Sequence, residues 1–286
     1  MRPCHAATLL LMVSLAACSA TGVLNALAPR DGITVTRDIA YADGPRHALD
    51  VYAPRPSGTP APVLVFFYGG NWDSGAKAMY RFVGAAMAAR GVLTVIPDYR
   101  LYPQVRFPDF MYDAANAVAW TQANVARYGG DPHRLFFMGH SAGAQIATLL
   151  ALDPAYLRSA GLSPRDVCGV IGLAGPYDFL PLHDDELKAI FGPEAERPRS
   201  QPINYVSPQA PPMLLLAGRD DTTVDPGNTL RLAARLRAAG VSVQDELYSG
   251  VGHKTLIAAF ARPLGFLAPT REAAVRFIDA HGACGG

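Results

Sequence analysis

Residues 135–143 read Leu-Phe-Phe-Met-Gly-His-Ser-Ala-Gly, a short apolar run that leads directly into the pattern G-x-S-x-G. The run is typical of a strand, and residues 142–150 are typical of a helix. A strand that turns at once into a helix through this pattern forces the serine backbone into a sharp, strained elbow. The elbow exposes the hydroxyl at the carboxyl edge of a sheet. Ser141 is therefore the predicted nucleophile.

The hydrophobic pattern around this elbow predicts one doubly wound α/β domain. Continuous apolar runs indicate strands buried on both faces, as in a parallel sheet between helices, whereas alternation indicates an antiparallel edge. The continuous runs are 63–67, 92–96, 135–138, 170–173 and 213–217, the alternating ones are 34–39 and 48–52, and a last strand is expected at 241–248. Helix-like stretches lie between them at 76–90, 110–128 and 230–239. We therefore expect a mostly parallel sheet flanked by helices.

One stretch interrupts the alternation of strands and helices. Residues 177–212 contain many prolines, an acidic cluster and a short helix-like piece at 187–191. We interpret them as a small cap inserted over the carboxyl edge of the sheet. The cap could be a functional lid over the active site, or an insertion with only a structural role.

Composition excludes several classes of function. The chain has 286 residues with 25 basic and 24 acidic side chains, a formal net charge of +1. Such a balance indicates neither a nucleic-acid partner nor an acidic membrane partner. The sequence has no phosphate loop, metal-ligand cluster or dinucleotide-binding glycine pattern, so we expect no metal and no cofactor.

The amino terminus looks like a targeting segment. Arg2 precedes an apolar stretch, 6–17, that is too short to span a bilayer and has the length of a signal-peptide core. It ends Leu-Ala-Ala-Cys at Cys18, which resembles the lipobox of bacterial lipoproteins. That resemblance implies a signal peptide (1–17), a lipid on Cys18, a tether (18–33) and a catalytic domain (34–286). An ordinary secretory signal cut near Ala20 is the alternative.

The resulting expected location is the bacterial cell envelope, with the membrane contacted only through the lipid anchor. Ser19 follows the cysteine, which favours the outer membrane; a secreted or periplasmic protein is the alternative. In that oxidising setting Cys168 and Cys284 can pair, although a buried free thiol is the commoner state for a cysteine that opens a central strand.

An acyl-transfer serine needs a base and a group that orients the base. Three histidines follow Ser141, and His253 is favoured because it lies in a glycine-flanked loop directly after the final strand, whereas His183 lies in the cap and His281 near the chain end. The acid is expected in the loop after 213–217. Asp225 precedes a proline and reads as a helix cap, which leaves Asp220 and Asp221. Asp221 fits the spacing G-x-x-D-x-x-V and is preferred.

Backbone N–H groups are expected to bind the oxyanion. One is that of Ala142, which the elbow points inward at the start of its helix. Others should come from residues 68–72, Tyr-Gly-Gly-Asn-Trp, where glycines let the main chain approach a substrate.

Together these residues resemble the α/β-hydrolase esterases, in particular the branch of hormone-sensitive-lipase-type carboxylesterases and kynurenine formamidases. Residues 68–72 are similar to its H-G-G-x-W loop, 98–100 to its Asp-Tyr-Arg loop, 139–143 to its elbow, and 128–132 is also characteristic. The resemblance runs from about 34 to 280. It implies oxyanion donors at Gly70, Asn71 and Ala142, and a triad of Ser141, Asp221 and His253.

The chain departs from this pattern at Tyr68, which replaces the usual histidine of the loop. The hydrogen bonds by which the histidine imidazole would steady the loop must therefore be formed by the Tyr68 phenol or are lost. The expected function is hydrolysis of small carboxylic esters with short acyl chains, because the cap is small and Trp72 would crowd the oxyanion loop. An aryl-formamidase-like amide hydrolase and a non-catalytic surface lipoprotein are the alternatives. Natural substrate and oligomeric state stay open.

Overall fold

The computed structural model describes residues 20–282 and 284. It contains an eight-stranded sheet with strand order β1-β2-β4-β3-β5-β6-β7-β8. The strands are β1 (Ile33–Ala40), β2 (Ala48–Pro54), β3 (Ala61–Phe67), β4 (Leu93–Pro97), β5 (Gly130–His140), β6 (Val167–Leu173), β7 (Met213–Gly218) and β8 (Val243–Tyr248). β1 and β2 are antiparallel to their neighbours, and the other pairs are parallel. The expected mostly parallel sheet with an antiparallel edge is confirmed.

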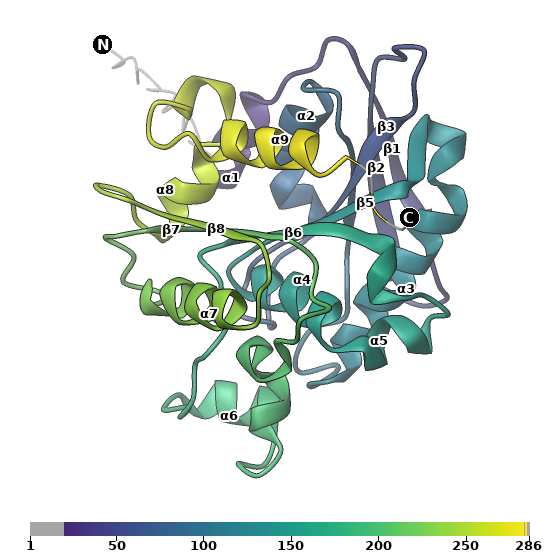
Figure 1. The fold of residues 1–286 in the computed structure, drawn as a ribbon. Helices are drawn as coiled ribbons and strands as arrows, with labels where there is room; N and C mark the ends of the chain where they lie inside the picture. The colour runs from purple at the N-terminus through teal and green to yellow at the C-terminus, as the bar shows by residue number, and fades with distance from the viewer. Residues whose placement is uncertain (1–19, 283, 285–286) are drawn as a thin grey trace, which may run out of the picture.

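Helices cover both faces of this sheet. They are α1 (Ala20–Ala26), α2 (Arg81–Ala88), α3 (Asp109–Asn124), α4 (Ala142–Leu152), α5 (Pro154–Ser159), α6 (Asp185–Phe191), α7 (Gly227–Ala238), α8 (His253–Ala258) and α9 (Thr270–Ala280). In Figure 1, α1, α2 and α9 lie on one side of the sheet, and α3, α4, α5 and α7 lie on the other, with α6 beyond them. The central strands are buried on both faces, which explains their continuous hydrophobicity.

The helix expected at 76–90 is split into a 3-10 turn, η1 (Lys77–Tyr80), and α2. The break is bridged by a side chain from α1. The Asn25 amide donates to the Ala78 carbonyl at 2.8 Å, and its oxygen accepts the Phe82 N–H at 3.0 Å. A long-range contact that no local pattern encodes therefore satisfies the backbone groups at the break.

These contacts also change the interpretation of the amino-terminal tether. Within the expected tether, 18–33, the structure has the short helix α1, which packs against η1 and α2. The chain after Ala20 is thus attached to the domain and is not a free spacer. The expected signal peptide and Cys18 lie outside the described residues. No helix in the described part of the chain is long and apolar enough to cross a membrane.

The carboxyl tail is fixed to the start of β6 by a disulfide. Cys168 and Cys284 are bonded, with their Cα atoms 4.9 Å apart and a sequence separation of 116 positions. The structure therefore favours the bridge over the buried free thiol, the commoner state expected from sequence. Closing so long a loop restricts the unfolded chain, which is the general source of disulfide stabilisation.

The cap between β6 and β7 is fastened to the domain by buried amide side chains. The Asn228 carbonyl oxygen on α7 accepts the N–H groups of Tyr177 and Asp178, at 2.9 and 2.8 Å. Within the cap, Gln201 accepts the Phe179 N–H at 2.7 Å. On the domain side, Gln145 of α4 donates to the Ser200 carbonyl at 2.9 Å. These bonds hold the cap over the carboxyl edge of the sheet.

Candidate active site

Ser141 lies between the end of β5 and the start of α4 with φ 56° and ψ −126°. A positive φ is costly for a side chain with a Cβ, and such strain is found at nucleophile elbows. The flanking glycines make the turn possible. A Cβ at Gly139 would lie 2.0 Å from the Gly143 oxygen, and one at Gly143 would lie 2.1 Å from the Phe67 oxygen.

Asp221 and His253 meet across the carboxyl edge of the sheet. His253 is the first residue of α8, and its Nδ1 is 2.7 Å from an Asp221 oxygen. The other oxygen of this buried carboxylate accepts the N–H groups of Thr223 and Val224, each at 2.9 Å. With the carboxylate so held, His253 carries its proton on Nδ1 and leaves Nε2 able to accept.

The His253 ring lies beside the elbow. Its centroid is 4.7 Å from that of His140, the residue before Ser141. Among the described residues, Ser141 and His253 form no hydrogen bond with each other; apo sites often tighten this contact only when substrate binds.

The competing candidates have other positions. Asp220 is exposed and its carboxylate has no partner in the described chain. His281 is bonded to the Phe277 carbonyl at the end of α9, and His183 lines a pocket in the cap. Asp225 accepts the Gly227 N–H at 2.9 Å, which lowers the pKa of its carboxyl. It is not the N-cap expected from sequence, because α7 begins at Gly227 and Pro226 holds that position.

The loop after β3 supplies candidate oxyanion donors. Gly70, Asn71 and Trp72 all have positive φ, at 138°, 55° and 61°. Within the described chain, no hydrogen bond uses the N–H of Gly70, Asn71 or Ala142. Asn71 and Ala142 line the same pocket as Ser141. The arrangement leaves the N–H groups of Asn71 and Ala142 free in the pocket that holds Ser141, where an oxyanion would form, whereas Gly70 does not line that pocket.

Tyr68 occupies the position at which the esterase branch named above has histidine. Its contacts support the loop after β3. Its hydroxyl donates to Asp98 at 2.8 Å and accepts from Arg46 at 2.7 Å. Its ring stacks on Tyr99 at 4.7 Å. Burial raises the pKa of the Tyr68 phenol well above its usual value, so it stays a neutral donor. The Arg46 guanidinium also donates to the Gly75 carbonyl at 2.9 Å, which ties the loop to the same group.

We expect Tyr68→Phe to lower kcat about tenfold with little change in KM, because a displaced loop loses oxyanion stabilisation in the transition state more than substrate binding. Asp98 and Arg46, which are partly buried, each lose a partner, at a cost of about 1–2 kcal/mol in unfolding free energy. Steady-state kinetics and denaturant unfolding measure both. Tyr52→Phe, which removes a buried phenol beside Asp50, is the control. An unchanged kcat in Tyr68→Phe would contradict the supporting role.

Sequence reasoning missed His140, the variable residue inside the elbow pattern. Its ring is buried and its Nε2 is 3.1 Å from the His253 carbonyl oxygen. Burial, followed by the nearby His253 ring, lowers the pKa of His140 to about 3. A neutral ring whose Nε2 carries the proton can donate to that oxygen and so holds the His253 backbone near Ser141. A histidine within an otherwise apolar elbow was the only signal for this contact.

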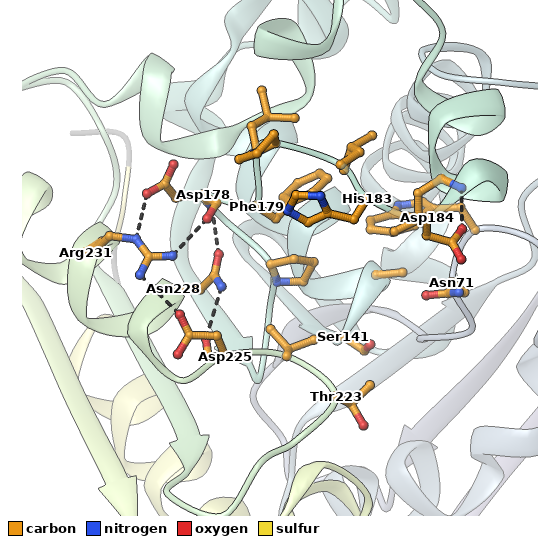
Figure 2. Close-up of a pocket in the computed structure, with 18 residues that line it drawn as sticks. Asn71, Ser141, Asp178, Phe179, His183, Asp184, Thr223, Asp225, Asn228 and Arg231 are labelled. Atoms are coloured by element: carbon orange, nitrogen blue, oxygen red, sulfur yellow. Dashed lines mark hydrogen bonds and ion pairs between the residues drawn. The ribbon is translucent and has the colours of Figure 1, made fainter. Parts of the chain in front are cut away.

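Ser141 opens into a pocket of about 610 Å³ between the cap and the domain. Figure 2 shows Ser141 and Asn71 on one side, and Asp178, Phe179 and His183 of the cap on another. Trp72 joins the two parts: its indole N–H donates to Gln145 at 3.1 Å, and its ring packs on Phe179. Trp72 thus lies in the wall of this pocket. No cluster of potential metal ligands exists in the described chain.

The strand order, the elbow and the acid and histidine after it define an α/β-hydrolase. Esterase B from Lactobacillus rhamnosis has a similar fold, with a TM-score of 0.78 at 20% identity over 92% of this chain and 90% of that one. A truncated carbohydrate esterase from gut microbiota gives 0.77 at 20% identity, over 89% and 99%. The chain belongs to the BD-FAE family, whose model matches residues 49–236.

Curated relatives are esterases by name. The probable isoprenylcysteine alpha-carbonyl methylesterase ICME of Oryza sativa subsp. japonica is 33% identical over 241 residues, which cover 77% of this chain and 58% of that protein. Esterase LipC of Mycobacterium tuberculosis is 32% identical over 264 residues, which cover 85% and 64%. This chain spans about three fifths of the length of these relatives.

Proposed function

We propose that the protein hydrolyses small carboxylic esters through an acyl-enzyme intermediate. The observation that carries this proposal is the 2.7 Å contact between Asp221 and His253 beside a strained Ser141, next to free backbone N–H groups. The names of the relatives support it. Hydrolysis of p-nitrophenyl acetate and butyrate by the purified protein tests it, and N-formylkynurenine in the same assay tests the amide alternative.

The proposed mechanism follows from the geometry. The Ser141 oxygen attacks the ester carbonyl while His253 Nε2 takes its proton, and the N–H groups of Gly70, Asn71 and Ala142 stabilise the oxyanion. His253 then protonates the leaving alcohol, and a water repeats the sequence on the acyl-enzyme. Asp221 fixes the tautomer and stabilises the imidazolium; it does not take the proton.

We expect a preference for short acyl chains. The cap spans only the stretch between β6 and β7, and Trp72 and Phe179 close one wall of the pocket. Each added methylene can contribute about 0.8 kcal/mol only where there is apolar surface to bury it against. A series of p-nitrophenyl esters from two to twelve acyl carbons measures this. A kcat/KM that keeps rising beyond about eight carbons would contradict the expectation.

We also propose that the mature protein is lipid-anchored in the bacterial cell envelope through Cys18. The Leu-Ala-Ala-Cys sequence supports this, and the Cys168–Cys284 disulfide suits an oxidising compartment.

The anchor predicts a clear effect of Cys18→Ser. The variant should accumulate as uncleaved precursor held in the inner membrane by its signal, because lipid transfer to the cysteine sulfur precedes cleavage. Immunoblotting of membrane and soluble fractions, with metabolic labelling by a palmitate analogue, measures this. Normal cleavage and release of the variant would show a simple secretory signal.

A further inference from the structure

Two neighbouring hollows lie beside α1, and both are lined by arginines. They share Pro29 and Arg30. One, of about 470 Å³, adds Arg90, Arg262 and Arg271; the other, of about 350 Å³, adds Arg37 and Arg81. We call the surface formed by these six arginines the arginine face.

Four of the six arginines lack an acidic partner in direct contact within the described chain. Among the described residues, Arg30, Arg37, Arg81 and Arg262 form no salt bridge and are exposed. The acidic groups at this face are Asp31, which lines the first hollow, and Glu272, which pairs with both Arg90 and Arg271. The exposed Asp38 carboxylate is bound to Lys77 and lies within electrostatic reach of Arg37 and Arg81.

This is a local excess, because the chain as a whole carries a net charge of only +1. The balanced overall composition gave no sign of an acidic membrane partner, because the acidic residues elsewhere in the chain offset this local cluster of arginines.

The first described residues of the chain lie beside the same face. α1 begins at Ala20, two residues after Cys18, and contributes the chain that leads to Pro29 and Arg30. It is held there by the Asn25 contacts to η1 and α2.

Apolar side chains accompany the charge. Val23 and Leu27, on and just after α1, are 49% and 40% exposed. Phe266, four residues after Arg262, is 80% exposed. Exposed apolar side chains in segments that also carry arginines are typical of surfaces that contact a bilayer.

We propose that the arginine face binds the anionic phospholipid headgroups of the bilayer in which Cys18 is anchored. The charge of the arginines and the position of α1 are independent observations. The arginines supply charge complementarity to anionic headgroups. A lipid on Cys18 would bring α1, and the arginine face beside it, to the membrane. Each arginine near an anionic surface strengthens binding by about fivefold. The face thus sets the orientation of the domain as well as its attachment.

This orientation has a consequence for the substrate. The arginine face involves α1, α2 and α9, on one side of the sheet, whereas the Ser141 pocket is lined by the cap and α7, on the other (Figure 1). The bound domain holds its pocket away from the bilayer. If the protein hydrolyses esters as proposed, its substrates are therefore water-borne esters and not lipids of the same membrane.

The test uses the mature protein, as purified from the producing cell, on vesicles of phosphatidylcholine with and without one-third phosphatidylglycerol. We expect amide hydrogen exchange at 27–37, 81–90 and 262–271 to slow severalfold only on the anionic vesicles. High salt should abolish the protection, because it screens the charges. The triple variant Arg30→Gln, Arg37→Gln, Arg81→Gln should bind about a hundredfold more weakly and lose the protection.

A matched control variant removes three arginines that lie outside the arginine face, are also exposed and also form no salt bridge within the described chain. Its substitutions are Arg158→Gln, Arg165→Gln and Arg235→Gln. It should keep the protection. Equal protection on both kinds of vesicle, protection retained in the first variant, or protection lost in the control would each overturn the proposal. Hydrolysis of a soluble ester by the same samples separates the two ideas, since the first variant should hydrolyse it at the wild-type rate even where the protection is lost.

Discussion

Ser141→Ala should lower kcat for ester hydrolysis by about five to six orders of magnitude while leaving the fold intact. The hydroxyl makes no hydrogen bond with any other described residue, so its removal leaves no buried partner unsatisfied. Alanine meets the same backbone strain at φ 56° that serine does. The free energy of unfolding should therefore change by less than about 0.5 kcal/mol.

Two measurements check this expectation. Steady-state kinetics on p-nitrophenyl butyrate gives the loss of kcat, and a fluorophosphonate probe followed by peptide mass spectrometry identifies the labelled residue. Wild type should carry the label on Ser141. A label elsewhere, or substantial activity in the alanine variant, would refute the proposed nucleophile, and inactivity of wild type on every ester tested would favour a non-catalytic role.

Asp221→Asn should lower kcat by about four orders of magnitude. The Asp221 carboxylate uses one oxygen for the Thr223 and Val224 N–H groups and the other for His253 Nδ1. An asparagine that keeps its oxygen on the backbone donors turns its NH₂ group toward Nδ1. His253 then shifts its proton to Nε2 and cannot accept the serine proton.

Asp220→Asn is the matched control, because the neighbouring carboxylate is exposed and unpaired within the described chain. Asp225→Asn should also keep most activity, although the charge that pairs with Arg231 is lost. Activity of each variant is compared with its thermal unfolding midpoint. A large loss in Asp220→Asn with little loss in Asp221→Asn would move the acid by one residue and refute the geometry described above.

The features that sequence could predict are those encoded locally. Continuous apolar runs identified the central strands, and the pattern at 139–143 identified the elbow, because a strained turn flanked by close-packed glycines requires particular residues at fixed spacing. The preference for Asp221 over Asp220 also came from spacing.

The features that sequence could not predict depend on side chains far apart in the chain. Asn25 splits an expected helix from a distance of 57 residues, and Arg46 reaches across the fold to support Tyr68. The separation of Cys168 from Cys284 gave no geometric signal of pairing. A net charge of +1 also could not reveal that arginines gather on one face.

The fastening of the cap has a kinetic consequence. Because Asn228 and Gln145 hold the cap in place without a ligand, association with a small inhibitor should be a single second-order step. Stopped-flow tryptophan fluorescence, to which Trp72 in the pocket wall contributes, would then give an observed rate that rises linearly with inhibitor concentration, without the plateau that a slow opening step imposes. Asn228→Ala frees the Tyr177 and Asp178 N–H groups, so the loosened cap should introduce that plateau. The residence time of a bound ligand would then depend on how fast the cap opens.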